Sequence, residues 1–141
     1  MLYVGIVGAG KGGTALFKIL SGIPDVEIIG VADLDDKAPG MILAREANIF
    51  TTRDFTELLQ DPRKKIIIDA TGLENVNNRL RELADNQTNI VDSSAALLMM
   101  LMVESREKLI RKLEEQSGQM AELARELSDT MMEISATSEK M

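Results

Sequence analysis

The first 94 residues alternate short apolar runs with segments of helical periodicity. The apolar runs predict β-strands at 2–7, 26–32, 48–51, 66–70 and 89–91. Apolar spacing together with glycine and proline turn signals predicts helices at 12–20, 39–47, 54–59 and 75–86. Because strand and helix alternate throughout, we expect an α/β fold with right-handed crossovers and a parallel sheet.

The chain changes character after residue 94. Residues 95–141 contain no proline and a single glycine, and they are rich in Leu, Met, Glu, Lys, Arg, Gln and Ala, which predicts one long helix. The start of this segment, 97–103, is apolar on all sides. We expect part of it to cover the open side of the sheet and the rest to meet its counterpart in a dimer. Two domains are therefore predicted, 1–94 and 95–141.

The long segment carries a heptad-like seam. Its core positions follow a 4-3-4-3-4 spacing at Leu109, Leu113, Gln116, Met120, Leu123 and Leu127. That spacing is typical of a coiled coil. Beyond Leu127 the seam either continues through Thr130, Ile134, Thr137 and Met141 or shifts by one residue through Met131 and Ile134. We expect a coiled-coil C-terminal helix that joins two copies of the chain, with parallel and antiparallel pairing both open.

A glycine-rich turn follows the first strand and matches G-x-G-x-x-G at Gly8, Gly10 and Gly13. The first glycine permits the tight turn, the second lets the backbone approach a pyrophosphate, and the third lets the helix pack close to the sheet. Free N–H groups at the start of that helix favour an anion. Asp33 ends the second strand 20 residues after Gly13, where a carboxylate accepts hydrogen bonds from the ribose hydroxyls of adenosine.

These features predict a Rossmann-like dinucleotide-binding domain. The Asp33 carboxylate repels a 2′-phosphate, and Asp35 and Asp36 reinforce that repulsion, so NAD is favoured over NADP. A P-loop is excluded because Gly-Lys-Ser/Thr does not occur at the required spacing. The alternative hypothesis is a Rossmann-like domain in which the glycines serve packing alone and no dinucleotide binds.

Further site candidates flank the turn and the strand ends. Lys11 either adds a charge contact or points into solvent. Thr71 and Gly72 follow the fourth strand, where they contact the cofactor or form an ordinary turn. Ser93 and Ser94 follow the fifth strand and face the nicotinamide end, unless Ser94 caps the long helix. The full set expected at the cofactor is Gly8, Gly10, Lys11, Gly12, Gly13, Asp33, Leu34, Thr71 and Gly72.

The composition excludes several classes of catalytic and metal-binding site. With no cysteine and no histidine, the chain offers no disulfide, no thiolate metal ligand and no Ser-His-Asp triad. No spacing identifies a catalytic group or a metal site. A net charge of -7 and few aromatic residues argue against nucleic acid. The longest apolar run, 95–103, is shorter than the roughly 20 residues of a membrane-spanning helix, and no leader is visible, so we expect a cytoplasmic protein without membrane insertion.

Two resemblances add to these expectations. Segments 4–13, 31–33 and 68–72 resemble the N-terminal domains of dihydrodipicolinate reductase, homoserine dehydrogenase and aspartate dehydrogenase. This resemblance implies that the glycine turn and Asp33 hold the dinucleotide. Those enzymes continue into a catalytic domain, whereas this chain enters a long helix. Residues 126–139 are similar to the signalling helix of methyl-accepting chemotaxis proteins.

The main functional hypothesis is therefore an NAD(H)-binding sensor or regulatory module. Its dimeric helix would transmit cofactor occupancy to a downstream signalling domain or kinase. The alternative is an NAD-dependent oxidoreductase, or the cofactor-binding fragment of one. A third hypothesis is a dimerisation scaffold with a vestigial cofactor site.

Overall fold

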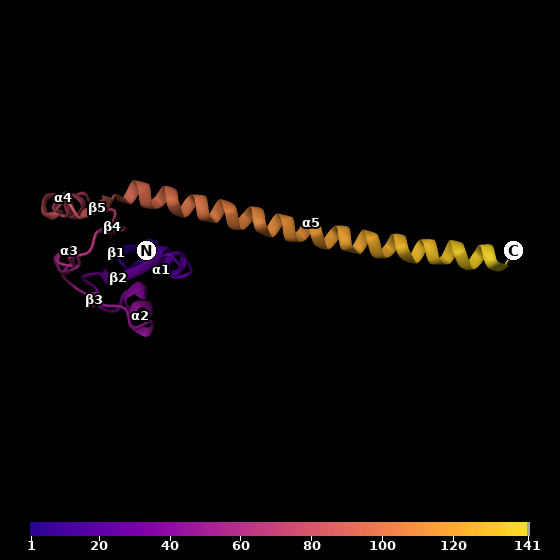
Figure 1. Cartoon of the computed structure of the whole chain (residues 1–141), viewed down its shortest axis with the longest axis horizontal. Helices are drawn as coiled ribbons and strands as arrows, with labels where there is room; N and C mark the ends of the chain where they lie inside the picture. The colour runs from indigo at the N-terminus through magenta and orange to yellow at the C-terminus, as the bar shows by residue number, and fades with distance from the viewer. Residues whose placement is uncertain (141) are drawn as a thin grey trace. The chain divides into compact units, whose positions relative to one another are not determined.

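The computed structural model describes residues 1–140, and side chains as far as Thr137. Strands and helices alternate along the described chain, as the sequence predicts (Figure 1). In order they are β1 (Leu2–Val7), α1 (Lys11–Ser21), β2 (Val26–Ala32), α2 (Pro39–Glu46), β3 (Thr51–Thr52), α3 (Thr56–Leu59), β4 (Lys65–Asp69), α4 (Glu74–Leu83), β5 (Thr88–Val91) and α5 (Ser93–Lys140). Met141, the last position of one predicted seam, lies outside the described residues.

The strands form one parallel sheet in the order β3-β2-β1-β4-β5. This is the strand order of the Rossmann fold, in which the chain reverses direction across the sheet between β1 and β4. The predicted fold class, a Rossmann-like α/β sheet followed by a long C-terminal helix, is therefore confirmed. Coiled-coil pairing of that helix stays a prediction.

Two element boundaries differ from the sequence prediction by three residues, and the others differ by two or fewer. The third strand begins at Thr51, not at residue 48, because Asn48 has a φ of 59° and turns the chain after α2. Its N–H also bonds to the carbonyl of Arg45. The fourth helix ends at Leu83, because the backbone of Ala84 is extended (φ -66°, ψ 133°).

Apolar side chains cover both faces of the sheet. On one face, helices α1 and α2 pack through Leu16, Phe17, Leu20, Met41 and Ala44. On the other face, α3 and α4 contribute Leu58 and Leu80. The strands supply both layers because alternate side chains point to opposite faces: Ile66 and Ile68 belong to the first layer and Ile67 to the second.

The start of α5 is partly buried. Ala96 is buried, and Met99 and Met100 pack against the core on the face covered by α1 and α2. In contrast, Leu97 and Leu98 are 56% and 60% exposed. The apolar start of the helix thus covers part of the sheet, as expected, and leaves other apolar side chains in solvent.

The chain divides into two compact units, Met1–Leu101 and Met102–Met141. The first contains the whole sheet and the first turns of α5, and the second contains the rest of that helix. Among the described residues, no helix combines the length and apolar character needed to cross a membrane.

Candidate functional site

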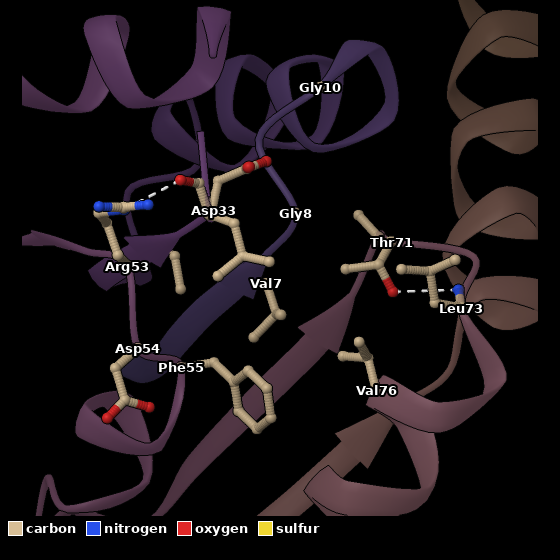
Figure 2. Close-up of a pocket in the computed structure, with 13 residues that line it drawn as sticks. Val7, Gly8, Gly10, Asp33, Arg53, Asp54, Phe55, Thr71, Leu73 and Val76 are labelled. Atoms are coloured by element: carbon tan, nitrogen blue, oxygen red, sulfur yellow. Dashed lines mark hydrogen bonds between the residues drawn. The ribbon is translucent and has the colours of Figure 1, made fainter. Parts of the chain in front are cut away.

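A cavity of about 510 Å³ lies at the carboxyl end of the sheet (Figure 2). Its walls come from the last residues of β1 and β2, from the segments that follow β1, β2, β3 and β4, and from Val76 of α4. Parallel α/β sheets bind ligands at this edge, beside the point where the strand order reverses. The cavity volume falls within the usual range for small-molecule sites.

The glycine turn forms one side of the cavity. Gly8 has a φ of +99°, and a Cβ there would lie 2.9 Å from the carbonyl carbon of Ala70, so only glycine fits. A Cβ at Gly13 would lie 1.7 Å from the carbonyl oxygen of Gly8. Helix α1 thus packs too closely against the turn to leave room for any side chain at position 13. A Cβ at Gly10 would meet no atom within 4 Å, and Gly10 lines the cavity. The packing therefore requires glycine at positions 8 and 13 but not at position 10.

The peptide groups of Ala9 tie the turn to its surroundings. Ala9 is fully buried, and its N–H donates to Oδ2 of Asp33 at 2.7 Å. Its carbonyl accepts the N–H of Gly40 at 2.9 Å and the hydroxyl of Thr14 at 3.1 Å. The turn is thus bonded to the end of β2 and to the first turns of α1 and α2.

Asp33 is held at the cavity wall by both of its carboxylate oxygens. While Oδ2 accepts the Ala9 N–H, Oδ1 accepts the N–H of Asp35 at 2.8 Å. Because each carboxylate oxygen has two acceptor positions, one on each remains for a ligand. Asp33 can therefore still accept hydrogen bonds from a ribose.

The segment after β4 faces Asp33 across the cavity (Figure 2). It is fixed by Asp69, whose fully buried carboxylate accepts the N–H and the hydroxyl of Thr71 at 2.9 and 2.6 Å. The side-chain amide of Asn77 donates to the other carboxylate oxygen at 3.2 Å. Gly72 follows with a φ of +69°. Thr71 lines the cavity, and its orientation depends on a buried acid that the sequence analysis did not place at the site.

Ser93, the first residue of α5, is bonded to this same turn. Its Oγ accepts the N–H of Gly72 at 3.0 Å and donates to the carbonyl of Asp69 at 3.0 Å. Ser94 is exposed. The alternative prediction that Ser94 caps the long helix is wrong, because Oδ1 of Asp92 accepts the N–H of Ala95 at 2.8 Å. Asp92 directly precedes the first residue of α5, which is the N-cap position, whereas Ser94 is the second residue of the helix.

Five of the nine residues expected at the cofactor line the cavity. These are Gly8, Gly10, Asp33, Leu34 and Thr71. The other four, Lys11, Gly12, Gly13 and Gly72, lie outside the lining. Lys11 is exposed at the first position of α1, and a Cβ at Gly12 would meet nothing within 4 Å.

The loop after β3 contributes three lining residues that the sequence analysis missed, Arg53, Asp54 and Phe55. The Nε–H of Arg53 donates to the carbonyl of Leu34 at 3.0 Å. Asp54 accepts the hydroxyl and the N–H of Thr56, and these bonds lower the pKa of its carboxyl group. The only signal in the sequence was that these residues directly follow a predicted strand; the pairing of that strand with β2 comes from the structure.

No protein-family model matches the chain, and no curated protein matches it. Among solved structures, it is similar to the crystal structure of an NAD-binding protein from Listeria innocua, with a TM-score of 0.54 and 20% identity. The match covers 74% of this chain and 32% of that protein. At this identity the likeness shows the Rossmann-like fold alone. These comparisons lend no support to the resemblance of residues 126–139 to a chemotaxis signalling helix. The likeness to dihydrodipicolinate reductase and to the two dehydrogenases stays a prediction.

Proposed function

We propose that the chain is an NAD(H)-binding regulatory module whose cofactor occupancy acts on helix α5. The observation that carries this proposal is the composition of the cavity wall. A glycine turn with an open Cβ position at Gly10 and a carboxylate at Asp33 face the same apolar cavity. Packing alone does not call for a glycine at position 10, whereas a pyrophosphate passing close to the backbone does.

The cavity suits the adenosine half of such a ligand. Its lining is mostly apolar, with Leu34, Phe55, Leu73 and Val76 around the space beside Asp33, which suits a purine ring. The ribose then meets the Asp33 carboxylate. The pyrophosphate lies over Gly10 at the start of α1, where no side chain caps the helix and the free N–H groups favour an anion.

The bonds of Ser93 support the regulatory part of the proposal. Thr71 lines the cavity, and the next residue, Gly72, donates its N–H to the first side chain of α5. A ligand that moves this turn therefore acts on the start of the helix through the two hydrogen bonds of Ser93. Such a ligand shifts the population of helix arrangements only as far as it binds them with different affinities.

The proposed partner is a second copy of the chain, bound through α5. The leucines of the seam, Leu109, Leu113, Leu123 and Leu127, are 58%, 56%, 63% and 63% exposed, and Met120 is 70% exposed. Apolar side chains at heptad spacing gain stability when a partner helix covers them. A downstream signalling domain or kinase would respond to the arrangement of the two helices.

Titration of the purified chain with NADH tests the binding. Nucleotide fluorescence reports occupancy, and sedimentation reports the mass of the complex. We expect saturable binding by a dimer without consumption of NADH. Substrate-dependent oxidation of NADH would instead establish the alternative, an oxidoreductase, and the absence of binding would leave a dimerisation scaffold.

The variant Ser93→Ala tests the coupling. It removes both hydrogen bonds between the helix start and the Asp69–Gly72 turn but leaves the cavity lining intact. We expect NADH to bind Ser93→Ala about as tightly as the wild type, while the effect of NADH on dimer dissociation disappears. Ser94→Ala is the matched control, because Ser94 is the exposed neighbour. If Ser93→Ala and Ser94→Ala respond to NADH equally, α5 does not receive the signal through Ser93.

A further inference from the structure

Arg53 is the only cationic residue that lines the cavity in the described structure. It extends from the loop after β3 toward the Asp33–Leu34 turn, on the side of the cavity opposite Thr71 and Leu73 (Figure 2). The carbonyl of Leu34 accepts the Nε–H of Arg53 at 3.0 Å. This hydrogen bond fixes the Nε end of the guanidinium group. An arginine has five N–H donors, so four remain for other contacts.

Arg53 also differs from the other four arginines of residues 1–101. Four other arginines, Arg45, Arg63, Arg79 and Arg81, each lie within 4.0 Å of a carboxylate oxygen. Among the side chains that the structure describes, no carboxylate lies within that distance of Arg53. Its sequence neighbour Asp54 bonds to Thr56 instead. No described carboxylate therefore competes with a cavity ligand for this exposed guanidinium group.

The rims of the cavity are apolar and open to solvent. Leu34, beside Arg53, is 77% exposed, and Leu73, on the opposite rim, is 55% exposed. Phe55 and Val76 line the space between the rims. Large exposed apolar side chains at the two edges of one cavity are typical of a site that binds an apolar part of a ligand.

We propose that Arg53 stacks its guanidinium group on the adenine ring of the bound nucleotide and so determines recognition of the base. The proposal rests on the proposed function, because it takes the ribose to lie at Asp33. Arginine stacks on aromatic faces through its planar charged group, which lysine lacks. The loop after β3 would then hold the base, while the glycine turn holds the pyrophosphate.

The charge around Arg53 distinguishes this role from that of a phosphate ligand. A 2′-phosphate would lie at the turn that carries Asp33, Asp35 and Asp36, three carboxylates in four residues. Within the part of the chain whose side chains are described, only Asp36 has an ion-pair partner there, Arg45 at 3.1 Å. The turn therefore disfavours a second anion, whereas a neutral ring beside Arg53 meets no such repulsion.

Isothermal titration of the 141-residue chain with ADP-ribose, NADH and NADP tests the proposal. We expect Arg53→Ala to weaken all three ligands by a similar factor, about 3- to 30-fold, as the loss of one cation–π contact implies. Arg53→Lys keeps the charge but loses the planar stacking surface, so it should recover only part of the lost affinity. Arg79→Ala is the matched control, because it removes the same charge from α4 outside the cavity lining, and it should leave all three affinities unchanged.

Two results would overturn the stacking role. One is unchanged affinity for ADP-ribose in Arg53→Ala. The other is a loss confined to NADP and restored by Arg53→Lys, which would make Arg53 a ligand of the 2′-phosphate. If the wild type binds ADP-ribose in an Arg53-dependent way but not NADH, the proposed function fails and the role of Arg53 stands. If the wild type binds none of the three ligands, both proposals fail.

Discussion

Replacing Gly13 by alanine places a methyl carbon 1.7 Å from the carbonyl oxygen of Gly8. Real Cβ atoms essentially never come within 3.0 Å of such an atom, so the turn and α1 must separate by more than an ångström. The helix carries Leu16, Phe17 and Leu20 into the core, and this shift disturbs their packing. We expect a loss of about 3 kcal/mol or more of folding free energy.

Gly10→Ala is the matched change at the same turn. A Cβ there meets no atom within 4 Å, and the backbone is extended, with a φ of -75° and a ψ of -151°. Gly10 is the N-cap residue of α1, where glycine and alanine differ by less than about 1 kcal/mol. The added methyl group would occupy the path proposed for the pyrophosphate, so we expect NADH affinity to fall at least about tenfold, or about 1.4 kcal/mol.

Thermal unfolding followed by circular dichroism, together with NADH titration, separates the two effects. For a domain of this size, about 3 kcal/mol corresponds to a fall in Tm of roughly 12–24 °C, which we expect for Gly13→Ala. Gly10→Ala should unfold within a few degrees of the wild type and bind NADH poorly. A wild-type Tm for Gly13→Ala would contradict the close packing of α1. Wild-type NADH affinity for Gly10→Ala would show that no phosphate passes over that residue.

Two further predictions concern charge. The double variant Asp33→Asn/Asp35→Ser removes two carboxylates from the turn proposed to face the 2′-position. It should therefore shift the ratio of NAD to NADP affinity toward NADP. An unchanged ratio in competition titrations would show that Asp33 does not select the cofactor. A hydrogen bond from Arg63 lowers the pKa of the Asp61 carboxyl group from 3.8 to about 2. The stability that the ionised Asp61 carboxylate contributes is therefore present above about pH 4 and is lost as the pH falls toward 2. Urea unfolding of Asp61→Asn should therefore show a stability deficit at pH 7 that narrows between pH 4 and pH 2, and a constant deficit would refute this assignment.

The sheet and the glycine turn could be predicted from the sequence because their signals are local. A buried parallel strand has a continuous run of apolar residues, as in 66–70. The two positions where the packing requires glycine, 8 and 13, have the spacing of a known sequence motif. Asp33 was predictable for a related reason, because its distance from the turn is set by one helix and one strand.

The rest of the site depends on contacts between distant segments. Arg53 and Phe55 reach the cavity only because β3 pairs with β2, and a strand of two residues gives little signal of that pairing. Ser93 bonds to a turn 21 residues earlier in the chain, and nothing in the sequence around it identifies that partner. Asp69 likewise resembles any polar residue at a strand end until its three hydrogen bonds are known.

The bonds around Ala9 also bear on the thermodynamics of ligand binding. Both peptide groups of this buried residue are already engaged, by Asp33 on one side and by Gly40 and Thr14 on the other. The turn is thus ordered before a ligand arrives, and binding loses little backbone entropy there. The entropic cost of association instead falls on the exposed side chains of the rim, Leu34 and Arg53, and on the torsions of the ligand itself.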